Sequence, residues 1–249
     1  MSIATRPYPL PVIGNYSAPR EMQISGIDAV VVDPHNEVLP YWFRFEGKPA
    51  VVVHIDRHND MIATAMPKLP NDDMALYSRT VGISTFIAAA RYYGGVSATY
   101  HLEAHSARID AYGRLLNGRP EGLPRTGLFK GRIFWIKDSL PFMTTEPKTI
   151  TTDDFFRDFS SYAGGLIADI DLDGFACLSR SFYSKPLAGH LEDAMQRIRW
   201  VMNLLERIPR PGLVTIARSQ TPYAFTPPEL VDEIEARVIQ ALDSLYAGR

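Results

Sequence analysis

Short apolar runs alternate along this chain with longer stretches in which apolar residues recur every three or four positions. The first pattern predicts buried strands, and the second predicts amphipathic helices. The expected strands are Ile27–Val32, Ala50–Ile55, 96–102, 132–136, 165–170 and Leu213–Ala217. The expected helices are 74–93, 155–162, 187–208 and a last helix with Thr226 as its N-cap and Pro227 at its first position.

This alternation predicts an α/β protein: a single three-layer domain over residues 1–249, with a mostly parallel sheet covered on both faces. A chain of 249 residues, 46% hydrophobic and 22% charged, is long enough to bury a substantial core. Residues 1–26 contain prolines at positions 7, 9, 11 and 19, and we expect this segment to be irregular.

Composition excludes several classes of function. The net charge of −2 lacks the basic excess expected of a nucleic-acid surface. A single cysteine, Cys177, excludes an internal disulfide and a multi-cysteine zinc site. No secretory signal is visible, and no apolar stretch approaches the ~20 residues that span a bilayer. We therefore expect a soluble, cytoplasmic protein.

Two acidic stretches each follow an apolar run, at the point where a strand would end. They read His-Ile-Asp-Arg-His-Asn-Asp over 54–60 and Asp-Ile-Asp-Leu-Asp over 169–173. Side chains two positions apart share a face of a strand. Asp56 and His58 should therefore point the same way, and so should Asp169 and Asp171. Carboxylates this close repel unless a cation lies between them. The mixture of carboxylates and histidines predicts a site for divalent ions, with Mn²⁺ or Fe²⁺ better suited than Zn²⁺.

The order of these motifs resembles the arginase and deacetylase superfamily, whose members carry a histidine near one strand end, then Asp-x-His-x-Asp, then Asp-x-Asp. The chain is most similar to an atypical branch described as peptide arginases. Three further segments match that branch: 33–37 with Leu39 and Trp42 after it, 82–87, and 215–219. Together the matching segments span about residues 27 to 230. The resemblance implies an arginase-like fold.

The resemblance also implies two Mn²⁺ ions held by six side chains. The terminal ligands are His35 and Asp60 for one ion and His58 and Asp171 for the other, and the bridging ligands are Asp56 and Asp169. Asp173 shares a face with Asp171, so it either replaces Asp171 in a register shifted by two or lies behind the ligands. His54 lies deeper in its strand, and we expect it to support the ligands.

The implied reaction is the hydrolysis of an arginine side chain within a ribosomally made precursor peptide, which gives ornithine and urea. Members of the superfamily often protonate the leaving amine with a histidine in a loop beyond Asp-x-His-x-Asp. Here that loop, 67–74, has no histidine. We expect His101, near the end of the next strand, to replace it. His105 is less suitable because we expect it to lie inside a helix.

Recognition of the guanidinium also departs from the family pattern. Arginases use a glutamate at the end of a later strand, whereas residues 217–219 here read Ala-Arg-Ser. We expect Glu37 or Glu229 to supply the negative charge, and Arg218 to bind a carbonyl or carboxylate of the peptide. Residues 116–131, rich in Gly, Pro and Arg, are expected to form a surface loop beside the substrate.

Two other functions fit the same residues. A deacetylase-like amidohydrolase would hold one zinc ion, although Asp60 argues for a second metal position. A non-catalytic protein, stabilised by metal, would bind basic peptides without cleaving them. Metal content and the fate of an arginine peptide separate the three functions.

Overall fold

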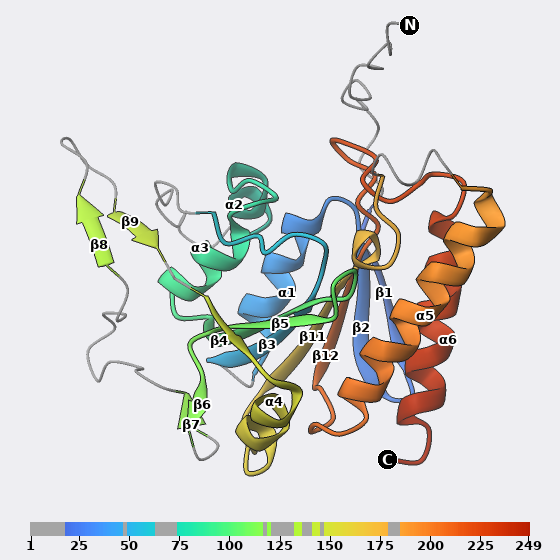
Figure 1. The fold of residues 1–249 in the computed structure, drawn as a ribbon. Helices are drawn as coiled ribbons and strands as arrows, with labels where there is room; N and C mark the ends of the chain where they lie inside the picture. Colours follow the sequence, from blue (N-terminus) through green and yellow to red (C-terminus); the bar gives the residue numbers. More distant parts are fainter. Residues whose placement is uncertain are drawn as a thin grey trace, which may run out of the picture.

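The computed structural model describes residues 18–46, 49–62, 74–116, 119–120, 132–135, 141–144, 147–178 and 185–249. An eight-stranded mixed sheet runs through its centre (Figure 1). Its strands, in spatial order, are β1 (Arg20–Ile24), β2 (Ile27–Val32), β12 (Leu213–Ala217), β11 (Leu166–Asp171), β3 (Ala50–Ile55), β4 (Val96–Glu103), β5 (Arg108–Tyr112) and β10 (Lys148–Ile150). Two small separate hairpins pair β6 (Leu115–Leu116) with β7 (Arg119–Pro120), and β8 (Arg132–Trp135) with β9 (Pro141–Thr144). The predicted α/β class is confirmed.

The neighbouring strands β2, β12, β11, β3 and β4 are all parallel, and the antiparallel pairs lie toward the two edges. From β3 the chain continues to β4 on one side, whereas from β11 it continues to β12 on the other. The direction of winding therefore reverses between β3 and β11. In open α/β sheets, ligands bind at the carboxyl ends of the strands beside such a point.

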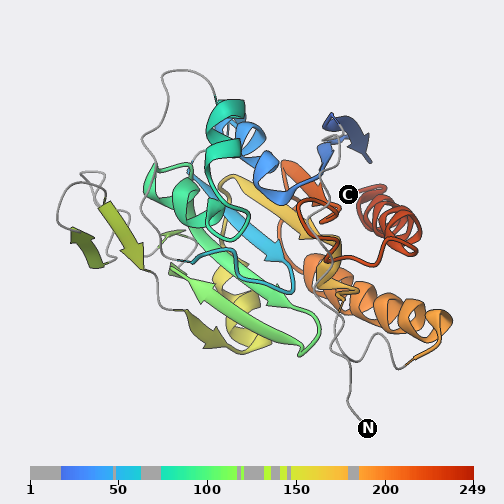
Figure 2. The same cartoon turned by 90° about the horizontal axis from the view of Figure 1, so that it is seen from above.

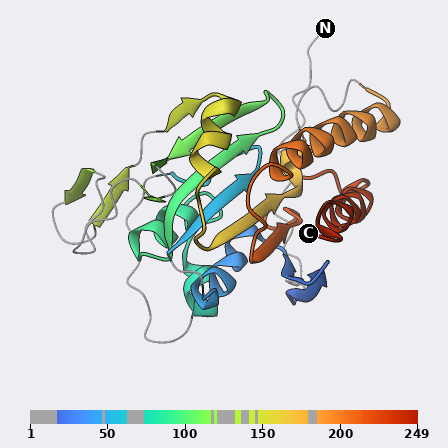
Figure 3. The ribbon, with the colours of Figure 1, turned by 90° about the horizontal axis from the view of Figure 1, so that it is seen from below.

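Helices cover both faces of the sheet (Figures 2 and 3). One face carries η1 (His35–Val38), α1 (Leu39–Arg44), α2 (Met74–Thr80) and α3 (Phe86–Tyr92), and the other carries α4 (Thr152–Phe159), α5 (Leu187–Leu205) and α6 (Val231–Tyr246). Strand side chains alternate between the two cores: Val51 and Val53 pack toward α4–α6, and Val52 packs toward α1–α3. Among the described residues, no helix is both long and apolar enough to cross a membrane.

The single helix predicted over 74–93 is wrong, because the chain forms α2 and α3 with a turn between them. The side chain of Asn36 donates hydrogen bonds to the carbonyls of Ser78 (2.6 Å) and Val81 (2.8 Å) at the end of α2. Gly82 follows at once, and glycine has a low helix propensity. The break in the helix therefore gives η1 a docking point.

The last helix begins at Val231, four residues after the predicted start at Pro227. Pro228 disfavours the helical conformation at Pro227, so the helix cannot start there. Residues 227–230 form a turn instead, in which the Leu230 amide donates to the Pro227 carbonyl (2.9 Å).

Two smaller predictions also need correction. The strand β1 lies inside the segment 1–26 that we expected to be irregular, and it pairs with β2 through a turn at Ser25 and Gly26. His105 lies in the turn between β4 and β5, and not in a helix.

Gly174 packs against the end of β3, where the winding of the sheet reverses, and Gly189 offers a comparison in an open position. A Cβ at Gly174 would lie 3.0 Å from the Cα of Asp56, whereas one at Gly189, in the first turn of α5, would meet nothing within 4 Å. We expect Gly174→Ala to lower the free energy of unfolding by about 1–3 kcal/mol. Gly189→Ala should raise it by up to about 1 kcal/mol. Urea denaturation measures both, and equal effects would show that the contact with Asp56 is unimportant.

Candidate metal centre

A row of buried polar side chains crosses four neighbouring strands. Asp169 on β11 is in register with Thr215 on β12 and with His54 on β3, and His54 is in register with His101 on β4. All four are at most 2% exposed. We call this set the lower row. Polar groups buried this deeply are costly unless they are hydrogen-bonded to one another.

Asp169 is the centre of the lower row. One of its oxygens accepts from the hydroxyl of Thr215 (2.5 Å), and the other pairs with Nδ1 of His54 (2.7 Å). Burial alone would raise the pKa of Asp169, but the charges and hydrogen bonds of His35 and His54 lower it to about 2. The indole nitrogen of Trp42 donates to Thr215 (3.4 Å) and extends the network into α1.

A second layer of carboxylates lies two residues further along the strands, where β3 and β11 end. Asp56 accepts from the amide of His58 (2.6 Å), and Asp171 accepts from the amide of Asp173 (2.9 Å) and from the hydroxyl of Ser219. These tight turns bring the carboxylates of both strands to one place.

Left-handed backbone occurs at two residues beside these carboxylates, Asp60 (φ 48°) and Ser219 (φ 52°). Such conformations cost of order 1 kcal/mol each and cluster at functional sites.

His35 is held in place by its neighbours on the helical side. The next residue, Asn36, is fixed to the end of α2, and the ring of Phe86 lies 4.7 Å from the imidazole of His35. The ring of Phe86 in turn lies 5.6 Å from that of Trp42. The histidine is 2% exposed, so its direction is set by packing on all sides.

The imidazole of His35 reaches both layers. Its Nδ1 lies 3.0 Å from a carboxylate oxygen of Asp171, 3.3 Å from one of Asp56 and 3.4 Å from one of Asp60. Its Nε2 lies 3.0 Å from Asp169 in the lower row. Burial opposes protonation, but Asp169 and Asp171 outweigh it and raise the pKa of His35 well above its usual value.

His58 approaches the same carboxylates from the solvent side. Its Nδ1 lies 3.0 Å from Asp173 and 3.5 Å from Asp56. Hydrogen bonds with Asp173 and then with Asp56 raise the pKa of His58 to about 11. Its side chain is 47% exposed, whereas those of Asp56 and Asp173 are 1% exposed. Asp56 is therefore the carboxylate that both histidines contact.

The geometry fits divalent ions. Metal–ligand bonds of about 2.1 Å place two ligands of one ion about 3.0–3.5 Å apart, which is the range of the contacts of His35 and His58. Three buried atoms at the centre lack a well-aligned hydrogen bond among the described residues: His35 Nδ1, Asp56 Oδ2 and Asp173 Oδ2. All three belong to sets of histidine, acidic or cysteine side chains whose ligand atoms lie within 4.8 Å of one another. These buried groups can hold a divalent metal.

The carboxylates also carry unfavourable charge that a cation would offset. Burial, and then the charge of Asp56, raises the pKa of Asp60 to about 7. Burial and the charges of Asp171 and Asp56 raise the pKa of Asp173 well above its usual value. Burial and the charges of neighbouring carboxylates thus both disfavour the ionised form of these acids.

Cys177 lies beside one end of the cluster, with its sulfur within 4.8 Å of ligand atoms of His58 and Asp173. Burial, and then the charges of Asp173 and Asp171, raises the pKa of its thiol. A protonated thiol is a poor metal ligand, because the thiolate is the form that binds.

The structure brings all six predicted ligands together, but it separates them into two layers. Asp169 lies in the lower row, where Thr215 and His54 occupy its oxygens, while Asp173 contacts His58. Of the two registers that the sequence left open, the geometry favours the shifted one, with Asp171 and Asp173 as ligands. His54 supports Asp169, in agreement with its place deeper in the strand.

The structure argues against His101 as the proton donor. Its Nε2 pairs with the backbone carbonyl of Asp56 (3.0 Å), and the side chain is 2% exposed. Burial, and then the charge of His54, lowers the pKa of His101 to about 4. His105 is similar: it pairs with the carbonyl of Asp173 (3.1 Å), and burial lowers its pKa to about 4. Neither imidazole carries the extra proton that an acid needs at neutral pH.

Glu37 does not join the cluster. It is 7% exposed, and its nearest positive group is Arg79, with Nε 4.0 Å from the carboxylate. Burial raises the pKa of Glu37. Glu229, the alternative acid, is exposed in the turn before α6. No contact of either carboxylate with the cluster is present among the described residues.

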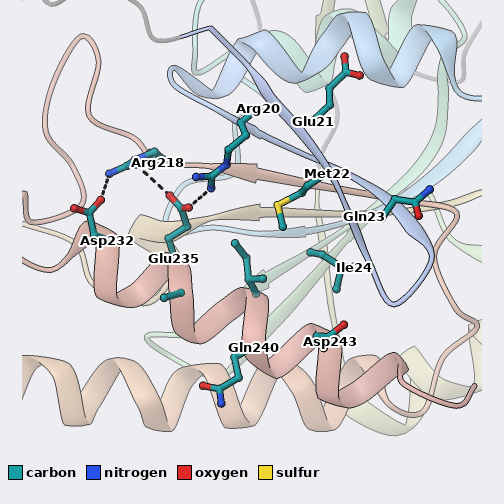
Figure 4. A pocket seen from close by; sticks show the side chains of 12 residues that line it. Arg20, Glu21, Met22, Gln23, Ile24, Arg218, Asp232, Glu235, Gln240 and Asp243 are labelled. Atoms are coloured by element: carbon teal, nitrogen blue, oxygen red, sulfur yellow. Dashed lines mark hydrogen bonds and ion pairs between the residues drawn. The ribbon is translucent and has the colours of Figure 1, made fainter.

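Arg218 points away from the predicted site. It is paired with Asp232 and with Glu235, whose carboxylate lies 3.3 Å from the Nη1 atom. Figure 4 shows these side chains in a groove between β1 and α6, where Arg20 also pairs with Glu235. The groove has a volume of about 910 Å³ and contains none of the predicted ligands. The role of Arg218 in substrate binding is therefore not supported.

Four side chains at the site received no role from the sequence: Trp42, Phe86, Thr215 and Ser219. All four belong to the segments on which the resemblance in the sequence was based, although spacing alone does not reveal their roles. The predicted substrate loop, 116–131, lies almost wholly outside the described residues, as does 67–73.

The two layers predict different effects for two neighbouring acids. Asp171→Asn removes a ligand, so we expect Mn²⁺ affinity to fall by more than ~100-fold. Asp169→Asn disturbs only the support of His35 and His54, so the loss should be about 10–100-fold. Isothermal titration calorimetry with Mn²⁺ measures the affinity of both variants. A larger loss of affinity in Asp169→Asn would favour the register in which Asp169 is a ligand.

Binding of an ion should also stabilise the fold, because it offsets the repulsion among Asp56, Asp171 and Asp173. At a free ion concentration about 100-fold above Kd, the gain in unfolding free energy is about 2.7 kcal/mol. Thermal melting with Mn²⁺, and then with excess EDTA, measures the gain and its reversal. Asp171→Asn is the control, and its melting temperature should be insensitive to the ion.

Comparison with known proteins does not place the chain in a family. A scan against models of protein families finds no match, and a search of curated proteins finds no similar sequence. The chemistry of the site is therefore judged from its own residues.

Proposed function

We propose that this chain is a hydrolase that converts arginine residues of a ribosomally made precursor peptide into ornithine and urea. It would use two divalent cations, which we expect to be Mn²⁺. The observation that carries the proposal is the position of Asp56, which is contacted by His35 from the buried side and by His58 from the solvent side. Each histidine has a further carboxylate of its own, Asp60 for His35 and Asp173 for His58.

This arrangement supports two adjacent ion positions. His35 and Asp60 would hold one ion, and His58 and Asp173 the other. Asp56 would be shared between them, with Asp171, which is 3.0 Å from His35, as the second shared ligand. A site for a single ion needs only three or four ligands, so a set of this size favours a pair.

Two such ions would lower the pKa of a bound water, so that hydroxide would be available to attack the guanidinium carbon near neutral pH. The chain's own residues fix the ligands. Ser219 orients Asp171, the amide of His58 orients Asp56, and the lower row holds His35 from beneath. Preorganised ligands of this kind need no rearrangement during the reaction.

The nature of the substrate rests on the resemblance to the peptide arginase branch. Five buried acids, Asp56, Asp60, Asp169, Asp171 and Asp173, meet three histidines, and two divalent cations would offset their charge. The matching segments place Trp42, Phe86, Thr215 and Ser219 around the ligands, which is consistent with the peptide arginase resemblance.

Incubation of the chain with Mn²⁺ and a set of arginine-containing peptides tests the reaction. We expect each converted arginine to lose the mass of CH₂N₂, with one urea released per event. Asp171→Asn is the control and should show no conversion above background. Metal analysis of the same protein should give about two ions per chain. One zinc ion per chain and no mass loss would contradict the proposal.

A further inference from the structure

The carboxylate cluster is open to solvent mainly beside His58. The side chains of His35, Asp56 and Asp173 are 1–2% exposed, whereas that of His58 is 47% exposed. The adjoining residues, Arg57 and Asn59, are also exposed. A substrate that reaches the ligands must therefore pass His58.

The loop over residues 218–226 lies against this opening and is fixed at several points. The hydroxyl of Ser219 donates to Asp171, and the amides of Gln220 (2.7 Å) and Thr221 (3.1 Å) donate to Asp33. The amide of Phe225 donates back to the carbonyl of Ser219 (2.9 Å) and closes the loop on itself.

Two further hydrogen bonds hold the C-terminal end of this loop. The amide of Leu178 donates to the carbonyl of Phe225 (2.8 Å), and the side chain of Gln220 donates to the carbonyl of Thr226 (2.8 Å). The loop is thus placed by the same contacts that orient a candidate ligand.

Two aromatic rings of the loop lead from solvent to His58. The ring of Phe225 lies 5.3 Å from that of His58, and the ring of Tyr223 lies 5.7 Å from that of Phe225. Tyr223 is 41% exposed, one of three large hydrophobic residues in the described part of the chain that are strongly exposed. The exposed ring of Tyr223 is thus connected to the buried cluster through Phe225 and His58.

We propose that Tyr223 and Phe225 form the wall that receives the arginine side chain of the substrate peptide, an inference that rests on the proposed function. A guanidinium is planar and weakly hydrated, so it stacks on aromatic faces more readily than an ammonium does. Residues 217–219 lack the acid that the family pattern places there, and Glu37 and Arg218 point elsewhere. Stacking on the wall supplies the recognition for which neither Glu37 nor Glu229 is placed.

A binding experiment tests the wall separately from turnover. Two labelled peptides that differ at one position, arginine or its neutral counterpart citrulline, are titrated into the full chain in EDTA, so that no arginine is converted, and fluorescence anisotropy gives each Kd. We expect arginine to bind at least ~10-fold more tightly. Tyr223→Ala should weaken arginine binding by about 5-fold or more and leave citrulline nearly unchanged, whereas Tyr223→Phe, which keeps the ring, should stay within about 2-fold of the wild type.

Phe225→Leu provides a second variant that keeps the apolar volume against His58 and removes the ring. It should lose the preference for arginine while thermal melting shows an intact fold. The proposal would be overturned if both Tyr223→Ala and Phe225→Leu kept the preference for arginine over citrulline. It would also be overturned if the wild-type protein did not distinguish the two peptides. Mass spectrometry of the same samples after addition of excess Mn²⁺ reports hydrolysis. A lack of mass loss with a ring-dependent preference would reject the hydrolase and keep the recognition of arginine.

Discussion

Repulsion between buried carboxylates is the constraint around which this end of the sheet is built. Asp56, Asp171 and Asp173 are at most 3% exposed and come from two neighbouring strands. Two like charges about 4 Å apart repel by about 4 kcal/mol at an effective dielectric constant of 20. The surrounding donors, His35, His58, Ser219 and backbone amides, offset only part of this cost, because the pKa values of Asp171 and Asp173 remain raised. A fold that keeps such a group of acids together gains most when a cation joins them.

The lower row explains how the acids are held. Asp169 sits two residues before Asp171 on the same strand and face, and its hydrogen bonds to Thr215 and His54 tie β12, β11 and β3 together inside a hydrophobic core. Such a network is rigid because Asp169, Thr215 and His54 are paired with one another. The ligands above it therefore stand on a fixed base, and the helices α1 and α3 contribute by placing Trp42 and Phe86 against it.

Most of the sheet could be predicted from the sequence, since the apolar runs at Ile27–Val32, Ala50–Ile55 and Leu213–Ala217 form strands with those bounds. The two acidic stretches could also be found, because each follows a buried strand in an α/β pattern. Two kinds of feature were out of reach. The break between α2 and α3 depends on Asn36, which is distant in sequence, and the depth of Asp169 relative to Asp173 depends on strand register. The alternation of side chains along a strand predicts the face on which each one lies. It does not predict which residue of that face lies nearest to solvent.

The parallel pairing of β3 with β11 joins parts of the chain that are far apart in sequence: His54 and Asp169 are 115 positions apart, and His35 and Asp169 are 134. Contacts of such long range form late, because the loops they close are entropically expensive. We therefore expect these ligands to come together only when the strands have paired. A divalent ion would then slow unfolding and leave the rate of folding nearly unchanged.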